Sequence, residues 1–254
     1  MAIRTRNSIT EIYGTVQGEG LYIGKPQIFI RMYGCEIGCA YCDTPDSLFD
    51  PDFALVEVSV NSDILEKYPN PLSKEKVLEI CNALSADMPT DVISLTGGEP
   101  LESVDYLMEL LPYLRQKGKY KILLETGGIH YTAYEKIADN IDIISMDIKL
   151  ASTSGLINPL PAHARFIESV KKHGKLANLY VKFIVNEGST VEEMDAAAKI
   201  IPADVPIIIQ PQTDDSGIVN KNVSDNAFLL YKHMLKSTKD ISFIPQMHKF
   251  MNLK

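Results

Sequence analysis

Three closely spaced cysteines are the residues of this chain best suited to chemistry. Cys35, Cys39 and Cys42 fall within eight residues, and Cys81 is the only other cysteine in the sequence. A closed zinc site usually takes four ligands, commonly as two Cys-x-x-Cys pairs or with nearby histidines, and no matching second pair is present. Three thiolates suit an iron–sulfur cubane in which one iron has no protein ligand and can bind a substrate or cofactor.

Other interpretations of these cysteines stay open. They could form a partial zinc site or a chance cluster in a reduced protein. Disulfide bonds are disfavoured, because three close cysteines leave one unpaired and nothing else marks the chain as secreted. Cys81 shares the apolar stripe of an expected helix with Val77, Ile80 and Leu84, so we interpret it as a small buried structural residue.

A second motif, Thr96-Gly97-Gly98-Glu99-Pro100, follows an apolar run that should form a strand. Paired glycines let a ligand approach the backbone closely, and exposed amide and carbonyl groups at a strand end can bind a charged amino-acid group. Taken alone, the motif also fits an ordinary strand-to-helix turn.

Composition narrows the class of protein. The formal charge is −8 and the basic residues are scattered, which argues against nucleic-acid binding and favours a small-molecule substrate. No uncharged apolar stretch approaches the roughly 18 residues of a membrane span. The N-terminus has basic residues but no apolar segment behind them, so a secretory signal is not supported and the expected location is the cytoplasm.

Apolar, β-branched runs alternate with helical patterns along the chain, which predicts an α/β fold with a parallel sheet built from βαβ units. The expected strands are 27–33, 91–96, 120–125, 141–147, 179–185, 206–210 and 241–244, and the expected helices are 73–86, 101–116, 132–139, 162–173, 191–201 and 224–236. Six such units make a partial barrel in one domain. The proline-punctuated segment 46–71 lacks sustained periodicity and should be an insertion. Ligands of parallel α/β folds bind beyond the carboxyl ends of the strands, where both motifs lie.

The two motifs resemble those of the radical S-adenosylmethionine (SAM) superfamily, in which the open iron of the cluster chelates the methionine end of SAM. Further motifs narrow the resemblance to the 7-carboxy-7-deazaguanine synthase family. In that family's order they are Gln17-Gly18-Glu19-Gly20, a strand ending near Arg31, the cysteine loop with Asp43-Thr44, the Gly-Gly-Glu-Pro turn, Glu125-Thr126-Gly127-Gly128, Gln210-Pro211 and Gln246-x-His248-Lys249.

The resemblance implies a partial (β/α)6-type radical SAM barrel spanning residues 1–254, with a cluster loop at 34–44, an insertion after it at 46–71 and a substrate-covering tail at 245–254. It implies conversion of 6-carboxy-5,6,7,8-tetrahydropterin into 7-carboxy-7-deazaguanine with loss of ammonia, a step toward queuosine or archaeosine. The implied cofactors are a [4Fe-4S] cluster, SAM and Mg²⁺. The implied partners are the pterin, an external flavodoxin- or ferredoxin-like electron donor and a second copy in a homodimer, with no nucleic acid and no membrane.

The resemblance also implies roles for individual residues. The cluster ligands would be Cys35, Cys39 and Cys42, and Thr44 would bind Mg²⁺. The substrate contacts would be Val16, Gln17, Gly18, Glu19, Arg31, Thr96, His248 and the terminal carboxylate of Lys254. The SAM contacts would be Gly98, Glu99, Glu125, Ser145, Asp147, Lys149, Gln210, Pro211, Gln212 and Thr213.

The chain departs from the family pattern at two places. It reads Ser145-Met146-Asp147-Ile148-Lys149 where the family has a Ser-Pro-Lys-like segment, and an acidic residue such as Asp147 can accept from ribose hydroxyls. Met247 replaces a threonine of the tail motif, which removes a hydroxyl contact. The histidines outside the tail motif lack a second ligand at metal-binding spacing and should be surface or packing residues.

Two rival functions are compatible with the cysteines. A glycyl-radical-enzyme activase shares the cysteine spacing but acts on a partner protein, and it has no need of Gln17, Glu19 or Arg31. A noncatalytic metal-binding scaffold would hold zinc without iron or sulfide.

Overall fold

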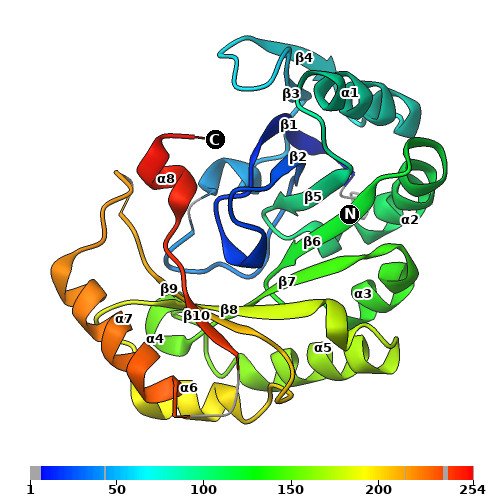
Figure 1. Cartoon of the computed structure of the whole chain (residues 1–254). Coiled ribbons are helices and arrows are strands. Elements are labelled where there is room, and N and C mark those ends of the chain that lie inside the picture. The colour runs from blue at the N-terminus through cyan, green and yellow to red at the C-terminus, as the bar shows by residue number, and fades with distance from the viewer. Residues whose placement is uncertain (1–6, 43, 215, 237–239, 254) are drawn as a thin grey trace.

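The computed structural model describes residues 7–42, 44–214, 216–236 and 240–253, and these residues form a ten-stranded sheet with helices on its outer side (Figure 1). The strand order is β10-β9-β8-β7-β6-β5-β2-β1-β3-β4. The strands are β1 (Ile9–Val16), β2 (Pro26–Met32), β3 (Phe53–Glu57), β4 (Leu65–Pro69), β5 (Val92–Gly97), β6 (Lys121–Thr126), β7 (Ile143–Ile148), β8 (Leu179–Val185), β9 (Ile207–Pro211) and β10 (Ile241–Phe243).

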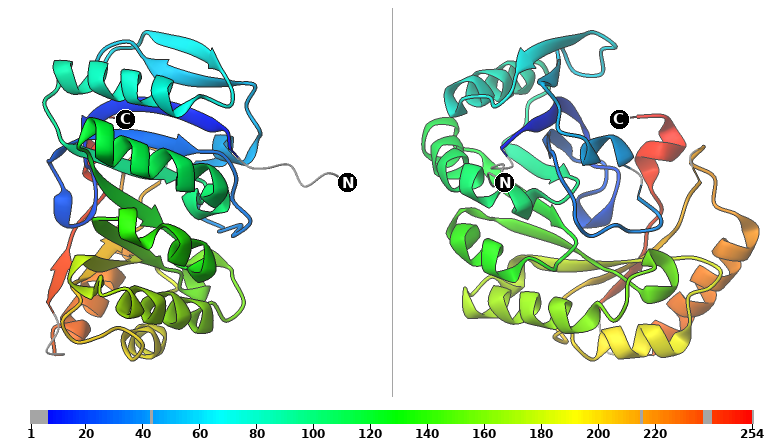
Figure 2. Two further views of the ribbon diagram at one scale, coloured as in Figure 1. Left: turned by 90° about the vertical axis from the view of Figure 1, so that its right-hand side faces the viewer. Right: turned by 180° about the vertical axis from the view of Figure 1, so that it is seen from behind.

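The run from β2 through β5 to β10 is parallel throughout and supplies the barrel part of the fold. All seven predicted strands are present there, which confirms the α/β class and the parallel sheet. These strands are apolar because both faces are covered; in β8 every residue is buried. The sheet curves without closing, so the architecture is consistent with the predicted partial barrel (Figure 2).

The other three strands were not predicted. β1 pairs antiparallel with β2 and parallel with β3, and β3 pairs antiparallel with β4. The last two lie inside segment 46–71, which was expected to be irregular. Each is only five residues long and β4 ends at Pro69, so neither is long enough to display a recognisable period.

The expected helices are all present, with shifted ends. The α-helices are α1 (Lys74–Asp87), α2 (Val104–Tyr113), α3 (Tyr131–Ile137), α4 (Ala151–Ser154), α5 (Leu160–Lys172), α6 (Val191–Ala198), α7 (Lys221–Met234) and α8 (Met247–Met251). The shorter turns are η1 (Gly20–Tyr22), η2 (Pro45–Leu48), η3 (Pro100–Ser103), η5 (Ala138–Asn140) and η6 (Leu176–Asn178), with a π-helical turn η4 (Leu114–Gly118). The short helices α4 and α8 were not predicted.

Side-chain caps fix where several helices begin. The side chain of Ser73 accepts a hydrogen bond from the backbone N–H of Lys76 at the start of α1, and Thr190 does the same for Glu193 at the start of α6. Such caps satisfy backbone donors that have no partner within the helix.

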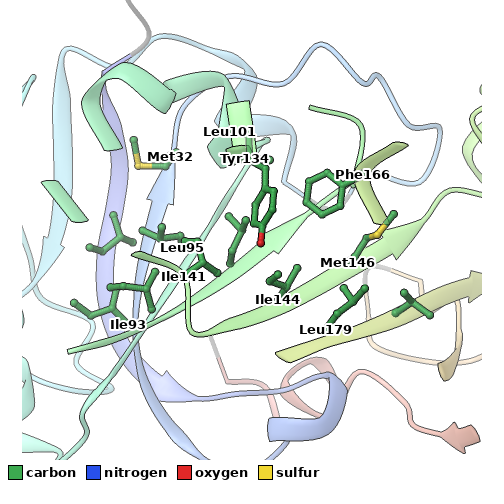
Figure 3. Packing of buried hydrophobic residues seen from close by; sticks show 14 of the residues in the cluster. Met32, Ile93, Leu95, Leu101, Tyr134, Ile141, Ile144, Met146, Phe166 and Leu179 are labelled. Atoms are coloured by element: carbon green, nitrogen blue, oxygen red, sulfur yellow. The ribbon is translucent and has the colours of Figure 1, made fainter. Parts of the chain in front are cut away.

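The core lies between the sheet and the outer helices (Figure 3). Tyr134 of α3 and Phe166 of α5 pack with ring centroids 5.0 Å apart above β6 and β7. Cys81 of α1 is fully buried, and burial raises the pKa of its thiol to about 12, which confirms its structural interpretation. Among the helices of the described residues, none combines the length and apolar character needed to cross a membrane.

Candidate active site

A cavity of about 530 Å³ opens beyond the carboxyl ends of the parallel strands, where the sequence analysis predicted that the motifs would lie. The N-terminal loop, the cysteine loop, the strand ends and the C-terminal tail all contribute to its wall. The predicted site residues that line it are Val16, Gln17, Gly18, Glu19, Arg31, Cys35, Cys39, Cys42, Thr44, Thr96, Gly98, Glu125, Asp147, Lys149, Gln210, Gln212, Thr213 and His248.

Three predicted site residues do not line this cavity, namely Glu99, Ser145 and Pro211, and Lys254 lies outside the described residues. The Glu99 carboxylate is fully buried and accepts from the hydroxyl of Thr126 at 2.9 Å and from the backbone N–H of Gly127 at 2.7 Å. It therefore ties the turn after β5 to the turn after β6.

The cysteine loop places its three thiols on one side of the cavity. Cys35 and Cys39 are half-buried and Cys42 is exposed, and burial raises the pKa of the first two thiols. In the described part of the chain, no three His, Cys, Asp or Glu side chains are grouped to hold a single metal ion. A [4Fe-4S] cluster binds each thiolate through a different iron, so its ligands need not converge on one point. This donor set suits such a cluster.

The paired glycines let the turn after β5 pack against the cysteine loop. A Cβ atom on Gly97 would lie 2.2 Å from the carbonyl oxygen of Met32, and one on Gly98 would lie 2.2 Å from that of Gly34. The backbone N–H of Glu99 donates to the same Gly34 oxygen at 2.7 Å. Gly98 is thus required by backbone contact with the cysteine loop, and Gly97 by backbone contact with the end of β2.

The Gln17 side chain is held by the protein itself. Its Nε2 donates to Glu125 Oε1 at 2.8 Å and to Gln27 Oε1 at 3.1 Å, and its Oε1 accepts from the backbone N–H of Glu19 at 3.1 Å. Both amide donors are therefore used, so this side chain fixes the loop.

Arg31 lies at the cavity wall with two of its donors engaged. Its Nε donates to Glu11 Oε1 at 2.6 Å and its Nη2 to the hydroxyl of Tyr13 at 2.9 Å. A guanidinium has further N–H donors beyond these contacts. Tyr13 stacks on Phe29 with centroids 5.2 Å apart, and both rings line the cavity, although the sequence analysis did not select them.

Four charged side chains alternate across the cavity. Lys182 Nζ contacts Glu19 Oε2 at 2.5 Å and Asp147 Oδ1 at 3.2 Å, and Lys149 Nζ contacts Asp147 Oδ2 at 2.9 Å. Burial by itself raises the pKa of Asp147, but the two lysines outweigh it and lower that pKa to about 2. Lys182 was missed by the sequence analysis; the available signal was a lysine inside the otherwise apolar β8.

The C-terminal tail lies against the N-terminal loop. The backbone N–H of Met247 donates to the Gly18 carbonyl at 2.9 Å, and a Cβ on Gly18 would lie 2.2 Å from His248 Nδ1. Gln246 Nε2 donates to Glu19 Oε1 at 2.8 Å, and the hydroxyl of Thr213 hydrogen-bonds to Gln246. The C-terminal tail thus borders the cavity together with the loop that follows β1.

Gln210 at the end of β9 is fully buried and lines the cavity, yet neither polar atom of its amide has a hydrogen-bond partner within the described residues. Buried polar groups are nearly always satisfied. This amide without a partner therefore fits a cavity that binds a polar ligand such as SAM.

His163, expected to be a packing residue, is buried beside the site. Its Nε2 accepts from the backbone N–H of Lys149 at 3.0 Å, and its Nδ1 lies 3.1 Å from the Gly128 carbonyl. These partners define the neutral tautomer with the proton on Nδ1. The ring joins the ends of β6 and β7.

The fold and the cysteine-lined cavity define a radical SAM enzyme, and the sequence profile of the radical SAM superfamily matches residues 29–203. The chain is 35% identical over 251 residues to the 7-carboxy-7-deazaguanine synthase of Geobacter sulfurreducens, covering 96% of each chain. It is 30% identical over 250 residues to the enzyme of the same name from Methanopyrus kandleri, covering 96% of this chain and 93% of the relative. The chain therefore belongs to the 7-carboxy-7-deazaguanine synthase family.

A comparison of structures agrees on the fold. The crystal structure of QueE from Escherichia coli superposes with a TM-score of 0.59 and 22% identity over 92% of both chains. As a radical SAM enzyme, the chain uses a [4Fe-4S] cluster and SAM as its cofactors.

Proposed function

We propose that this radical SAM enzyme of 7-deazapurine biosynthesis converts 6-carboxy-5,6,7,8-tetrahydropterin into 7-carboxy-7-deazaguanine with loss of ammonia, toward queuosine or archaeosine. One observation carries the proposal. The Gln17-Gly18-Glu19 loop and Arg31 line the same cavity as the cysteine loop, and the tail residue His248 completes that wall.

The cofactors would lie at the cysteine side of the cavity. Cys35, Cys39 and Cys42 would hold the cluster, and when bound the cluster and SAM supply the radical chemistry that starts the reaction. The SAM contacts that we propose are the cavity residues Gly98, Glu125, Asp147, Lys149, Gln210, Gln212 and Thr213. Lysine pairing keeps Asp147 ionised, so its carboxylate can accept from ribose hydroxyls.

The substrate would lie against the N-terminal loop. The remaining donors of Arg31 would bind the pterin carboxylate, and backbone groups of Val16 and Gly18 would bind the pterin amide edge. Burial by itself raises the pKa of Glu19, but Lys182 outweighs it and holds that pKa below its usual value. The ionised Glu19 can therefore accept from N–H groups of the aminopyrimidine, with Thr96 and His248 as further contacts.

We further propose a Mg²⁺ ion at Thr44. Its hydroxyl lines the cavity and lies 3.3 Å from the Gly97 carbonyl, which is long for an O–H···O bond, so the oxygen is not committed to a strong partner. Mg²⁺ prefers oxygen ligands and retains several waters, so one hydroxyl plus substrate oxygens is a reasonable set.

The partners in this proposal are the pterin, an external flavodoxin- or ferredoxin-like electron donor and a second copy of the chain. The direct test uses reduced, cluster-loaded protein with SAM, Mg²⁺ and the carboxytetrahydropterin. We expect the deazaguanine product and ammonia. Cleavage of SAM without that product would reject the substrate assignment.

Replacement of Cys39 by Ala checks the cluster ligands. The Cys39→Ala protein should form no 5′-deoxyadenosine and no deazaguanine, because removing one thiolate leaves too few ligands for the cluster. Cys81→Ala is the matched control, since that thiol is buried away from the cavity, and it should retain iron, sulfide and activity. Retained SAM cleavage in Cys39→Ala would contradict the assignment.

A further inference from the structure

Lys182 connects the two halves of the proposed site. Its ammonium group bridges Glu19 of the N-terminal loop, on the proposed substrate side, and Asp147 of β7, on the proposed SAM side. The first contact joins residues 163 positions apart in the sequence. The side chain is only 6% exposed, so this bridge is inside the molecule.

The position of Lys182 on its strand is unusual for a buried lysine. Its neighbours Val181 and Phe183 point into the apolar core under the outer helices, whereas Lys182 and Ile184 face the cavity. Removing a charge from water is costly, and the cost is offset only by well-placed opposite charges. An apolar residue here would avoid that cost, so stability of β8 alone does not account for the lysine.

Contacts at both ends extend the bridge. Glu19 Oε1 accepts from Gln246 of the tail, while Asp147 also pairs with Lys149, whose ammonium lies 5.1 Å from the ring centroid of Tyr41 in the cysteine loop. Both oxygens of Glu19 are therefore anchored, and Asp147 is held from two sides. A carboxylate oxygen can still accept further bonds, so neither anchor blocks a ligand.

We propose that Lys182 is a positioning residue. It fixes the Glu19 and Asp147 carboxylates relative to each other and thereby fixes the position of the bound pterin relative to SAM. The relative position of the two ligands matters, because the rate of a reaction between bound groups depends steeply on their separation and alignment. The inference rests on the proposed function. Lys182 itself need not touch the reacting atoms.

The test compares Lys182→Met, which keeps the length but removes the charge, with Lys182→Arg. The matched control is Lys121→Met, since Lys121 also lies on a strand and pairs with one carboxylate, Asp91, but is 59% exposed. Binding of SAM and of the pterin is measured by calorimetry on unreduced protein, where no turnover occurs. The ratio of deazaguanine to 5′-deoxyadenosine is then measured after reduction.

For Lys182→Met we expect about a tenfold loss of affinity for each ligand, because the two carboxylates lose the charge that fixes their spacing, and a lower product ratio. Lys182→Arg should recover part of both, and Lys121→Met should match the wild type. If Lys182→Met is merely less stable to heat, with both affinities and the ratio unchanged, the lysine is structural and the proposal is overturned. Should Lys182→Met not fold, the neutral polar variant Lys182→Gln takes its place, and an unchanged ratio with unchanged affinities in that variant would overturn the proposal.

A double-mutant cycle separates this role from independent effects. If Lys182 acts on the pterin through Glu19, the protein carrying Lys182→Met and Glu19→Gln should bind the pterin no more weakly than Glu19→Gln alone. Additive losses would overturn that path. If the wild-type protein does not bind the pterin, the proposed function fails. The affinity for SAM then tests the role of Lys182 separately: a tenfold loss in Lys182→Met supports the bridge to Asp147, and an unchanged affinity overturns it.

Discussion

At the scale of single residues, this site depends on buried polar groups that hold one another in place. Glu19, Asp147 and Lys182 are charged inside the molecule, the Gln17 amide donates to Glu125 of β6, and the Glu99 carboxylate accepts from the turn after β6. The family resemblance pointed to most of the residues that line the cavity. Lys182 could not be found this way, because its role depends on a contact with Glu19, which lies far away in the sequence. A single sequence does not reveal such contacts.

His163 should make stability sensitive to pH. Burial lowers the pKa of its imidazole to about 4, below the usual 6.5, so the folded protein keeps it neutral where the unfolded chain takes up a proton. The stability that this neutral ring contributes is present above about pH 6.5 and is lost as the pH falls toward 4. Urea unfolding at a series of pH values should show this decline.

The matched variant is His163→Gln, which keeps a donor and an acceptor but does not titrate. Its free energy of unfolding should be lower at neutral pH and should decline less between pH 6.5 and 4. An equally steep decline in both proteins would assign the pH dependence to other groups.

At the scale of elements, the parallel strands were predictable and the smaller pieces were not. Long, mostly apolar runs such as β8 can be recognised as strands, because burial of both faces favours apolar residues along the strand. β3, β4, α4 and α8 are each five residues or fewer, which is too short to display a recognisable period. The family resemblance implies that Glu99 contacts SAM, which stays a prediction, and the structure adds that its carboxylate ties two turns together.

Gly98→Ala should disturb the cluster loop. The new methyl group would meet the backbone oxygen of Gly34 at 2.2 Å, so the two motifs must separate, and we expect a loss of about 1–3 kcal/mol in stability together with lower iron content and weaker SAM binding. Gly188→Ala is the control, because its nearest contact would be an ordinary 3.4 Å. Iron and sulfide analysis with calorimetric SAM titration is the measurement. Wild-type iron content in Gly98→Ala would refute the expectation.

At the scale of the whole molecule, the loop after β1 and the C-terminal tail meet at one cavity. The N-terminal loop and the tail contact each other through Gly18, Glu19, Gln246 and Met247. Family motifs indicated a tail that covers the substrate, but the partners of Gln246 came only from the structure. Since these contacts join opposite ends of the sequence, the site forms only when the fold is complete.

Truncation after Gln246 should therefore affect the reaction more than stability. α8 contains no buried residue, so its removal should shift the thermal midpoint by only a few degrees. Affinity for the pterin should fall, and less product should form per SAM cleaved, because water would enter the cavity more freely. A truncated protein with an unchanged product yield would show that α8 takes no part in covering the site.

The buried Glu99 carboxylate has a mechanical effect as well. The carboxylate accepts hydrogen bonds from the hydroxyl of Thr126 and the amide of Gly127, and the backbone N–H of Glu99 donates to the Gly34 carbonyl. The segments that follow β2, β5 and β6 are therefore connected through one residue. A ligand that displaces one of these segments must displace all three, so conformational adjustment to different ligands falls to the C-terminal tail.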